Sequence, residues 1–142
     1  MTDLPKYVLD TNVIISALLF KNSQPRQALD KARQSGIVLM SQEIWTEIQE
    51  VLARPKFDKY ITYGEKKLFL IELVNTVNFI EVKENITTCR DAKDNKFLEL
   101  AVSGLASIIV SGDNDLLILN PFQNIPILTV KEFLKNDRTK SS

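Results

Sequence analysis

Short apolar runs alternate along the chain with longer segments in which apolar residues recur at helical spacing. The short runs predict five strands, at residues 7–9, 37–40, 79–82, 107–111 and 125–128. The longer segments predict helices over residues 13–19, 25–34, 41–53, 62–76 and 94–103. Gly36, Pro55 and Gly104 stand where three of these helices are expected to end.

Two capping boxes mark further helix starts. Thr62 with Glu65 opens the fourth helix, and Thr129 with Glu132 opens a short last one after the fifth strand. Strands separated by helices imply crossover connections and a mainly parallel sheet covered on both faces. The predicted fold class is therefore α/β, a three-layer α/β/α sandwich with a mainly parallel five-stranded sheet. Residues 1–135 are expected to form one domain and residues 136–142 a disordered tail.

Composition narrows the possible chemistry. Eighteen basic and eighteen acidic residues cancel, so no global positive field indicates nucleic acid, although a local basic rim is compatible with neutrality. The chain has no histidine, which excludes a Ser-His-Asp triad and imidazole ligands. The single cysteine, Cys89, excludes an internal disulfide and a zinc site of the CxxC type. Any metal must be held by oxygen, which favours magnesium, manganese or calcium.

No membrane association is expected. No apolar stretch approaches the roughly 18 residues of a membrane span, and the beginning of the chain lacks the layout of a signal peptide. A cytoplasmic location is the prediction.

Two predicted strands end in carboxylates. Asp10 closes the apolar run 7–9, and Asp113 and Asp115 follow the run 107–111. In open parallel sheets, ligands lie outside the carboxyl ends of the strands. Each position also has an ordinary structural interpretation: Asp10 as an N-cap, and "GDND" as a turn. At this point both interpretations stay open.

Two predicted helices carry further acids. Glu47 lies at the edge of the apolar face of the helix 41–53, where it is either a solvated charge or turned into a cleft. Asp94 lies on the same side as Phe97, one turn before it, so it is a helix cap, a ligand or both. Asp91, one turn earlier, is an auxiliary ligand or a loop residue. Carboxylates clustered in a cleft raise one another's pKa, and a divalent cation removes that penalty.

The chain resembles the PIN-domain ribonucleases over nearly its whole length. The resemblance rests on "YVLDTNVIISALL", "LARPKF", "RDAKDNKFLELA" and "IIVSGDNDLL" in this order, and is strongest for the branch described as toxins of toxin–antitoxin systems. It implies a quartet of acids that binds Mg²⁺ or Mn²⁺, with a possible fifth. By matching motif, these acids are Asp10, Glu47, Asp94 and Asp113, with Asp115 as the fifth. Glu43 and Glu50 are close alternatives to Glu47.

The implied reaction is hydrolysis of an RNA phosphodiester, in which the metal activates water and no side chain is the nucleophile. Small polar residues near the metal would be Thr11, Asn12 and Ser111. Cations that flank the acidic segments are candidates for binding substrate phosphates, or are simply solvated: Lys21, Arg54, Lys56, Arg90 and Lys93. An antitoxin protein is the implied partner, and a homodimer through the apolar helices 13–19 and 65–77 is a further expectation.

Other phosphate-handling folds fit less well. A phosphoacceptor receiver domain needs an early acidic pair, and a haloacid-dehalogenase-type phosphatase needs a second aspartate where Asn12 stands. No GxxxxGK[ST] loop is present, which excludes a P-loop nucleotidase. The remaining alternative is a non-catalytic interaction module that keeps the PIN fold.

Overall fold

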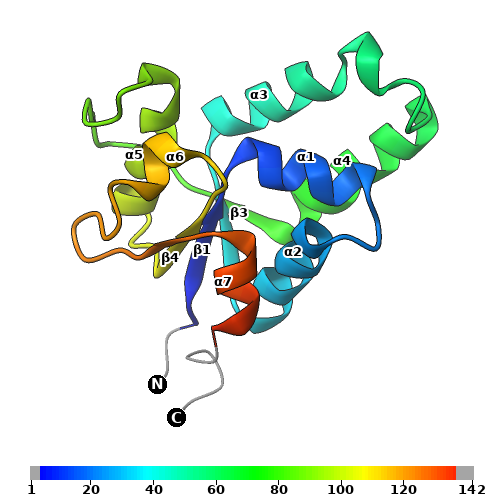
Figure 1. The fold of residues 1–142 in the computed structure, drawn as a ribbon. Helices are drawn as coiled ribbons and strands as arrows, with labels where there is room; N and C mark the ends of the chain where they lie inside the picture. The colour runs from blue at the N-terminus through cyan, green and yellow to red at the C-terminus, as the bar shows by residue number, and fades with distance from the viewer. Residues whose placement is uncertain (1–3, 137–142) are drawn as a thin grey trace.

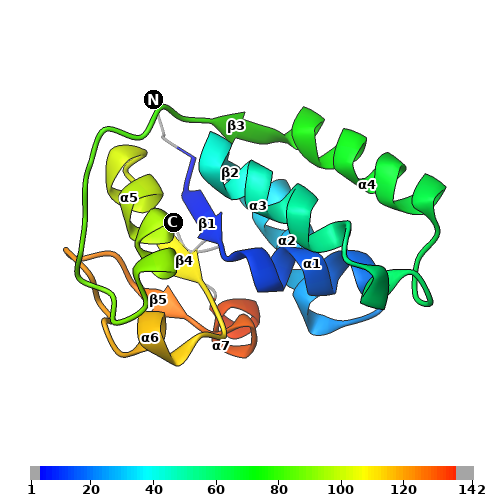
Figure 2. The same ribbon diagram turned by 90° about the horizontal axis from the view of Figure 1, so that it is seen from above.

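The computed structural model describes residues 4–136. Five strands form one sheet in which every neighbouring pair is parallel, in the order β3-β2-β1-β4-β5. The strands are β1 (Lys6–Leu9), β2 (Ile37–Met40), β3 (Val77–Phe79), β4 (Ile108–Val110) and β5 (Ile127–Leu128). Figures 1 and 2 show the sheet crossing the middle of the molecule. The predicted α/β architecture with a five-stranded parallel sheet is confirmed.

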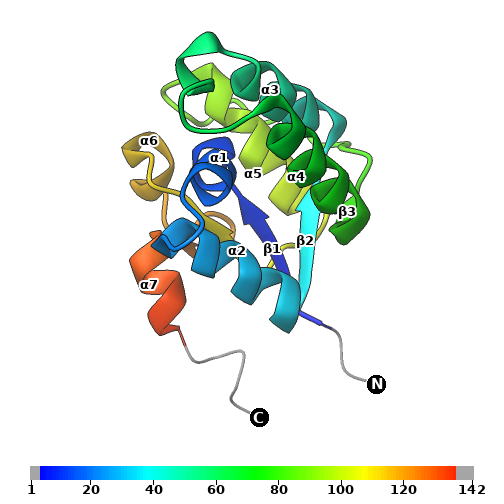
Figure 3. The same cartoon turned by 90° about the vertical axis from the view of Figure 1, so that its right-hand side faces the viewer.

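Helices cover both faces of this sheet. The α-helices are α1 (Thr11–Leu19), α2 (Gln24–Ser35), α3 (Gln42–Leu52), α4 (Tyr63–Thr76), α5 (Asn95–Ser103), α6 (Asn114–Leu117) and α7 (Val130–Lys135), with short 3-10 turns at Pro55–Phe57 and Ala92–Asp94. Helices α2 and α7 lie on one face and α5 on the other (Figure 3). None of the helices in the described part of the chain has the length and apolar character that a membrane crossing requires.

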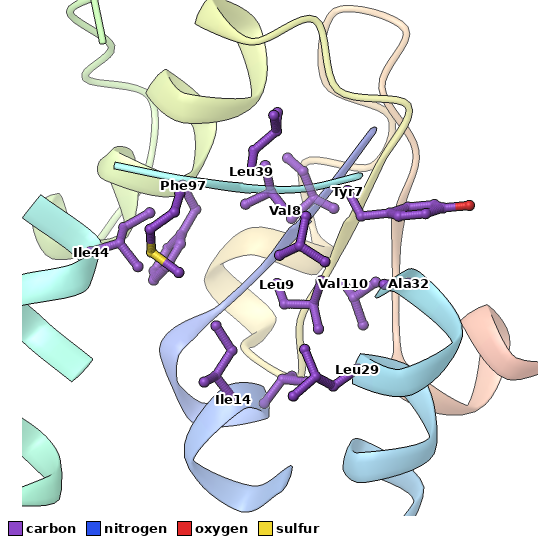
Figure 4. Close-up of a cluster of buried hydrophobic side chains, with 14 of the residues drawn as sticks. Tyr7, Val8, Leu9, Ile14, Leu29, Ala32, Leu39, Ile44, Phe97 and Val110 are labelled. Carbon is purple, nitrogen blue, oxygen red and sulfur yellow. The ribbon is translucent and has the colours of Figure 1, made fainter. Parts of the chain in front are cut away.

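The core is built from the central strands and the helices beside them. Figure 4 shows Val8 and Leu9 of β1 among buried side chains of α1, α2 and α3. Because β1 is the middle strand, both of its faces are covered, and three of its four residues are buried. A near-continuous apolar run is the pattern expected for such a strand.

Several boundaries differ from the sequence-based expectation. Helix α1 begins at Thr11 rather than residue 13, because the side chain of Asp10 caps it through the Val13 N–H at 2.8 Å. The third strand covers residues 77–79 instead of 79–82. Its partner β2 ends at Met40, where Ser41 caps α3, so the later residues have no strand beside them.

The last part of the chain also departs from the prediction. A turn was one of the two interpretations left open for the segment "GDND", and the structure instead continues it into the short helix α6, with Asp113 as its N-cap. The last helix begins after Thr129 as predicted, and both capping boxes form completely. The predicted disordered tail lies outside the described residues, except for Asn136.

Candidate metal centre

The site lies where the strand order reverses. Chain connections from β1 lead through β2 to β3 on one side, whereas β4 and β5 lie on the other. Ligand sites of open α/β sheets lie at such a switch point, outside the carboxyl ends of the strands. Asp10 directly follows β1, and Asp113 follows its neighbour β4 after two residues. Asp10 and Asp113, the two acids predicted at strand ends, therefore lie at the same edge of the sheet.

A pocket of about 190 Å³ opens at this place. Its lining includes all four acids that the sequence motifs singled out: Asp10, Glu47, Asp94 and Asp113. The remaining lining residues are Thr11, Asn12, Val51, Arg54 and Phe97. Four elements distant in the sequence thus bring carboxylates to a single small cavity, whose walls are otherwise two polar residues, one cation and two apolar side chains.

Asp10 combines the two roles that its position in the sequence left open. Its Oδ1 accepts the Val13 N–H as a helix cap, and its Oδ2 accepts a hydrogen bond from Ser111 Oγ. The carboxyl is 3 % exposed, and burial raises its pKa, with a smaller contribution from the charge of Asp113; its hydrogen bonds oppose the shift. Ser111 also accepts the Asp113 N–H at 2.9 Å, so one hydroxyl connects two of the acids.

Glu47 reaches the pocket from α3. Its Oε1 accepts a hydrogen bond from Thr11 Oγ1, and its Oε2 lies 3.1 Å from Lys96 Nζ. The alternatives Glu43 and Glu50 are exposed, and they line a neighbouring depression instead of the pocket itself. The structure thus distinguishes Glu47 from its two neighbours on the same helix.

Asp94 is a buried acid with a carboxylate oxygen that no donor of the described residues satisfies. It is 9 % exposed, makes no side-chain cap hydrogen bond to α5, and its buried Oδ2 has no hydrogen-bond partner. Its pKa is raised to about 6, mainly by burial and further by the charge of Asp113, a hydrogen bond with Asp113 and the charge of Asp91, while the charge of Lys96 opposes the shift. A buried, unpartnered carboxylate oxygen beside other carboxylates is the donor set that a hard divalent cation takes.

Asp115 and Asp91 extend the acidic cluster toward the surface. Asp91, Asp94 and Asp115 each place one carboxylate oxygen within 4.8 Å of the others. Asp91 caps the turn Ala92–Asp94 through the Lys93 N–H at 3.0 Å, and Asp115 lies 3.8 Å from Arg90 Nε. Asp94 therefore belongs both to the pocket and to this outer group. Asp115 and Asp91 do not line the pocket.

The thiol of Cys89 lies in the negative potential of this acidic cluster. It is buried, and its pKa is raised to about 11 by that burial and by the charges of Asp94, Asp115, Asp113 and Asp91. A thiol in such a field stays protonated and unreactive at neutral pH.

The candidate rim cations are not equivalent. Arg54 lines the pocket, and Arg90 is paired with Asp115. Lys21, Lys56 and Lys93 are exposed and do not line the pocket. Lys96, a cation that contacts one of the acids directly, was not identified from the sequence. A lysine inside an amphipathic helix is ordinarily solvated, and only the packing of α5 against α3 shows that this one is buried beside Glu47.

Comparisons with known proteins agree with this architecture. The chain is 36 % identical over 140 residues to the uncharacterized protein MJ1680 of Methanocaldococcus jannaschii, covering 92 % of this chain and 90 % of that protein. Similar solved structures include VapBC2 from Rickettsia felis bound to a DNA fragment from their promoter, with a TM-score of 0.58 and 14 % identity over 87 % of this chain and 98 % of the other. PAE2754 from Pyrobaculum aerophilum has a TM-score of 0.59 and 14 % identity, and the match covers 97 % of this chain and 91 % of the other.

These two structures support the fold alone, because their sequence identity is low. The family model described as "PIN domain" matches residues 6–115, which span β1 to α6 and contain every acid of the pocket. The chain therefore belongs to the PIN-domain family.

Proposed function

We propose that this protein is a divalent-metal-dependent endoribonuclease and the toxin of a toxin–antitoxin pair, acting in the cytoplasm. The observation that carries the proposal is the convergence of Asp10, Glu47, Asp94 and Asp113 on one pocket at the switch point of the sheet. Membership of the PIN-domain family supports the reaction class. The toxin role and an antitoxin partner follow from the resemblance of the motif segments to that branch of the family.

The residues of the pocket suit Mg²⁺ or Mn²⁺. Asp94, with its unpartnered buried oxygen, and its neighbours Asp10 and Asp113 would hold the ion, together with Glu47. Asp115 would be a further ligand, placed in the outer group with Asp91 and Asp94. Such an ion, when bound, lowers the pKa of water and offsets negative charge on a phosphodiester.

The polar residues in and around the pocket have roles that follow from their contacts. Ser111 keeps Asp10 oriented, and Thr11 keeps Glu47 oriented. Arg54, on the pocket wall, would bind a substrate phosphate, and Asn12 offers an amide to the same substrate. The cations outside the pocket would contact nucleotides farther from the cleaved bond: Lys21, Lys56, Arg90 and Lys93.

The test is cleavage of a mixed panel of RNAs with Mg²⁺ or Mn²⁺. Wild type is compared with Asp10→Asn, Asp94→Asn and Glu47→Gln, all purified identically. Glu50→Gln is the matched control, since Glu50 lies on the same helix as Glu47 and outside the pocket. We expect metal-dependent cleavage by wild type and the control, and a loss of about 10²-fold or more in the three pocket variants.

Two results would contradict the proposal. Equal cleavage by all five proteins would identify a contaminating ribonuclease. Tight Mn²⁺ binding without cleavage of any RNA in the panel would favour the non-catalytic interaction module.

A further inference from the structure

The amine of Lys96 is buried behind the acidic pocket. Its side chain is 6 % exposed, and its Nζ lies 3.1 Å from Glu47 Oε2, donates a hydrogen bond to the carbonyl oxygen of Lys93, and lies 4.9 Å from the centroid of the Phe97 ring. Lys96 lines the depression shared with Glu43, Glu47 and Glu50, and it does not line the pocket that holds the four acids. It therefore approaches Glu47 from the side away from Asp10 and Asp113.

Lys96 is too deeply buried to bind a substrate phosphate at the pocket. A lysine that binds RNA phosphates must be reachable by solvent, as Arg54 is at the pocket wall. Burying an ammonium group is costly unless it is paired, and lysines are rarely buried for packing alone. Glu47 and the Lys93 carbonyl supply that pairing. The ion pair fixes the second oxygen of Glu47, while Thr11 holds the first.

The ion pair of Lys96 with Glu47 changes the net charge that a divalent ion meets at the pocket. Four carboxylates line the pocket, and Lys96 neutralises one of them by direct contact. The other three acids form no ion pair with a cation of residues 4–136, and together they attract one divalent ion strongly. A second divalent ion would be repelled both by the first ion and by the buried ammonium group at Glu47.

We propose that Lys96 is a resident counter-cation that neutralises Glu47 and limits the centre to a single divalent ion. The inference rests on the metal site of the proposed function. It makes Lys96 a positioning residue: it does not line the pocket, and it acts through Glu47 and through its own fixed charge.

The experiment is a Mn²⁺ titration of the metal-free protein, with free Mn²⁺ followed by electron paramagnetic resonance. Lys96→Met keeps the length and packing of the side chain and removes its charge. We expect wild type to bind one Mn²⁺, and Lys96→Met to bind Mn²⁺ roughly tenfold more tightly, equivalent to about 1.4 kcal/mol, or to take up a second ion. Lys96→Arg keeps the charge and is expected to bind one ion. Lys131→Met, an exposed charge on α7, is the control for net charge.

A rescue experiment separates this role from a purely structural one. Glu47→Gln leaves Lys96 without its carboxylate, so we expect Mn²⁺ affinity to fall at least tenfold. Adding Lys96→Met to Glu47→Gln is expected to recover much of that loss, because the unpaired cation is gone. This double variant also provides the test should Lys96→Met alone fail to fold.

The proposal is overturned if Lys96→Met binds a single Mn²⁺ with unchanged or weaker affinity, or if the double variant binds no better than Glu47→Gln. A residue that only orients Glu47 would give these results. Absence of Mn²⁺ binding by wild type would also overturn it. Absence of RNA cleavage with Mn²⁺ binding intact would overturn the nuclease proposal and leave this one standing.

Discussion

Ser111 donates a hydrogen bond to Asp10 across 101 residues of sequence, and this bond joins the ends of the middle strand β1 and its neighbour β4. Asp10 N also donates to the carbonyl oxygen of Val110 at 3.0 Å, so the backbone pairing continues up to the acid. Ser111 is fully buried and in turn accepts the Asp113 N–H. The hydroxyl therefore fixes the relative position of two carboxylates at the switch point.

Removing this hydroxyl should weaken both the fold and the metal centre. We expect Ser111→Ala to lower the free energy of unfolding by about 1.5 to 3 kcal/mol, the range for hydrogen bonds to charged groups. Mn²⁺ affinity should fall as well, because Asp10 loses an orienting contact. Urea unfolding with and without Mn²⁺ measures both effects. An unfolding midpoint equal to that of wild type would show that Asp10 is held by its other contacts alone.

Asp94 should make the stability of the metal-free protein depend on pH. Its pKa is about 6 in the folded state, against an ordinary value of 3.8. Between these values the folded state binds more protons than the unfolded state, so stability should fall as pH rises from about 4 to about 6. Asp94→Asn should flatten this decline and make the metal-free protein more stable at pH 7 by about 2 kcal/mol, which is less than the full shift would give because solvent screens part of the charge.

Thermal unfolding in the presence of EDTA, recorded across that pH range, measures the effect. Asp58→Asn is the control, since Asp58 is an exposed aspartate outside the pocket. With Mg²⁺ present, wild type should instead gain stability at neutral pH, because the ion binds the ionised carboxylates, and Asp94→Asn should gain little. A variant that loses stability at every pH would contradict the interpretation of Asp94 as an uncompensated charge.

The positions of most acids could be predicted from local signals. A carboxylate directly after a fully apolar strand is conspicuous, and parallel strands bring their carboxyl ends to one edge. This reasoning located Asp10 and Asp113, and helical spacing located Asp94 on the buried side of its helix. Each of these predictions depends on residues within about one turn or one strand of the acid.

Other features depend on contacts between distant elements, and the sequence alone could not reveal them. The pairing of Glu47 with Lys96 needs α3 and α5 side by side. Leu105 continues the apolar spacing of Phe97 and Ala101 along the sequence, which predicts a buried side chain, and this prediction is wrong: the side chain is 77 % exposed. Helix α5 ends at Ser103, and Leu105 adopts a φ of 58°, which turns it away from the core.

Arg54 is expected to bind substrate and not metal. It is the one cation that lines the pocket within residues 4–136. Arg54→Ala should therefore raise KM for RNA about tenfold and reduce the salt dependence of binding by about one phosphate contact, with Mn²⁺ affinity unchanged or slightly higher. Lys131→Ala is the matched control on α7. A loss of kcat without a change in KM would instead place Arg54 at the reacting phosphate in the transition state.

The alignment of β1 with β2 depends on a close backbone approach at Gly36. A Cβ at this position would lie 2.2 Å from the carbonyl oxygen of Pro5, which accepts the Ile37 N–H at 2.9 Å. Since Lys6 pairs with Ile37 in the sheet, an alanine here must push apart the beginnings of the two strands. We expect Gly36→Ala to destabilise the protein by about 1 to 3 kcal/mol, as overpacking does.

Gly64 provides a matched control, at which alanine is expected to raise and not lower the free energy of unfolding. It lies in the first turn of α4, and a Cβ there would meet nothing nearer than Thr62 Oγ1 at 4.0 Å. Gly64→Ala should therefore stabilise the protein by roughly 0.4 to 1 kcal/mol, because alanine restricts the unfolded chain and favours the helix. Chemical unfolding of the two variants side by side measures the contrast. If both alanines shifted the midpoint in the same direction, the close approach of Gly36 to Pro5 would not be what holds β1 in register with β2.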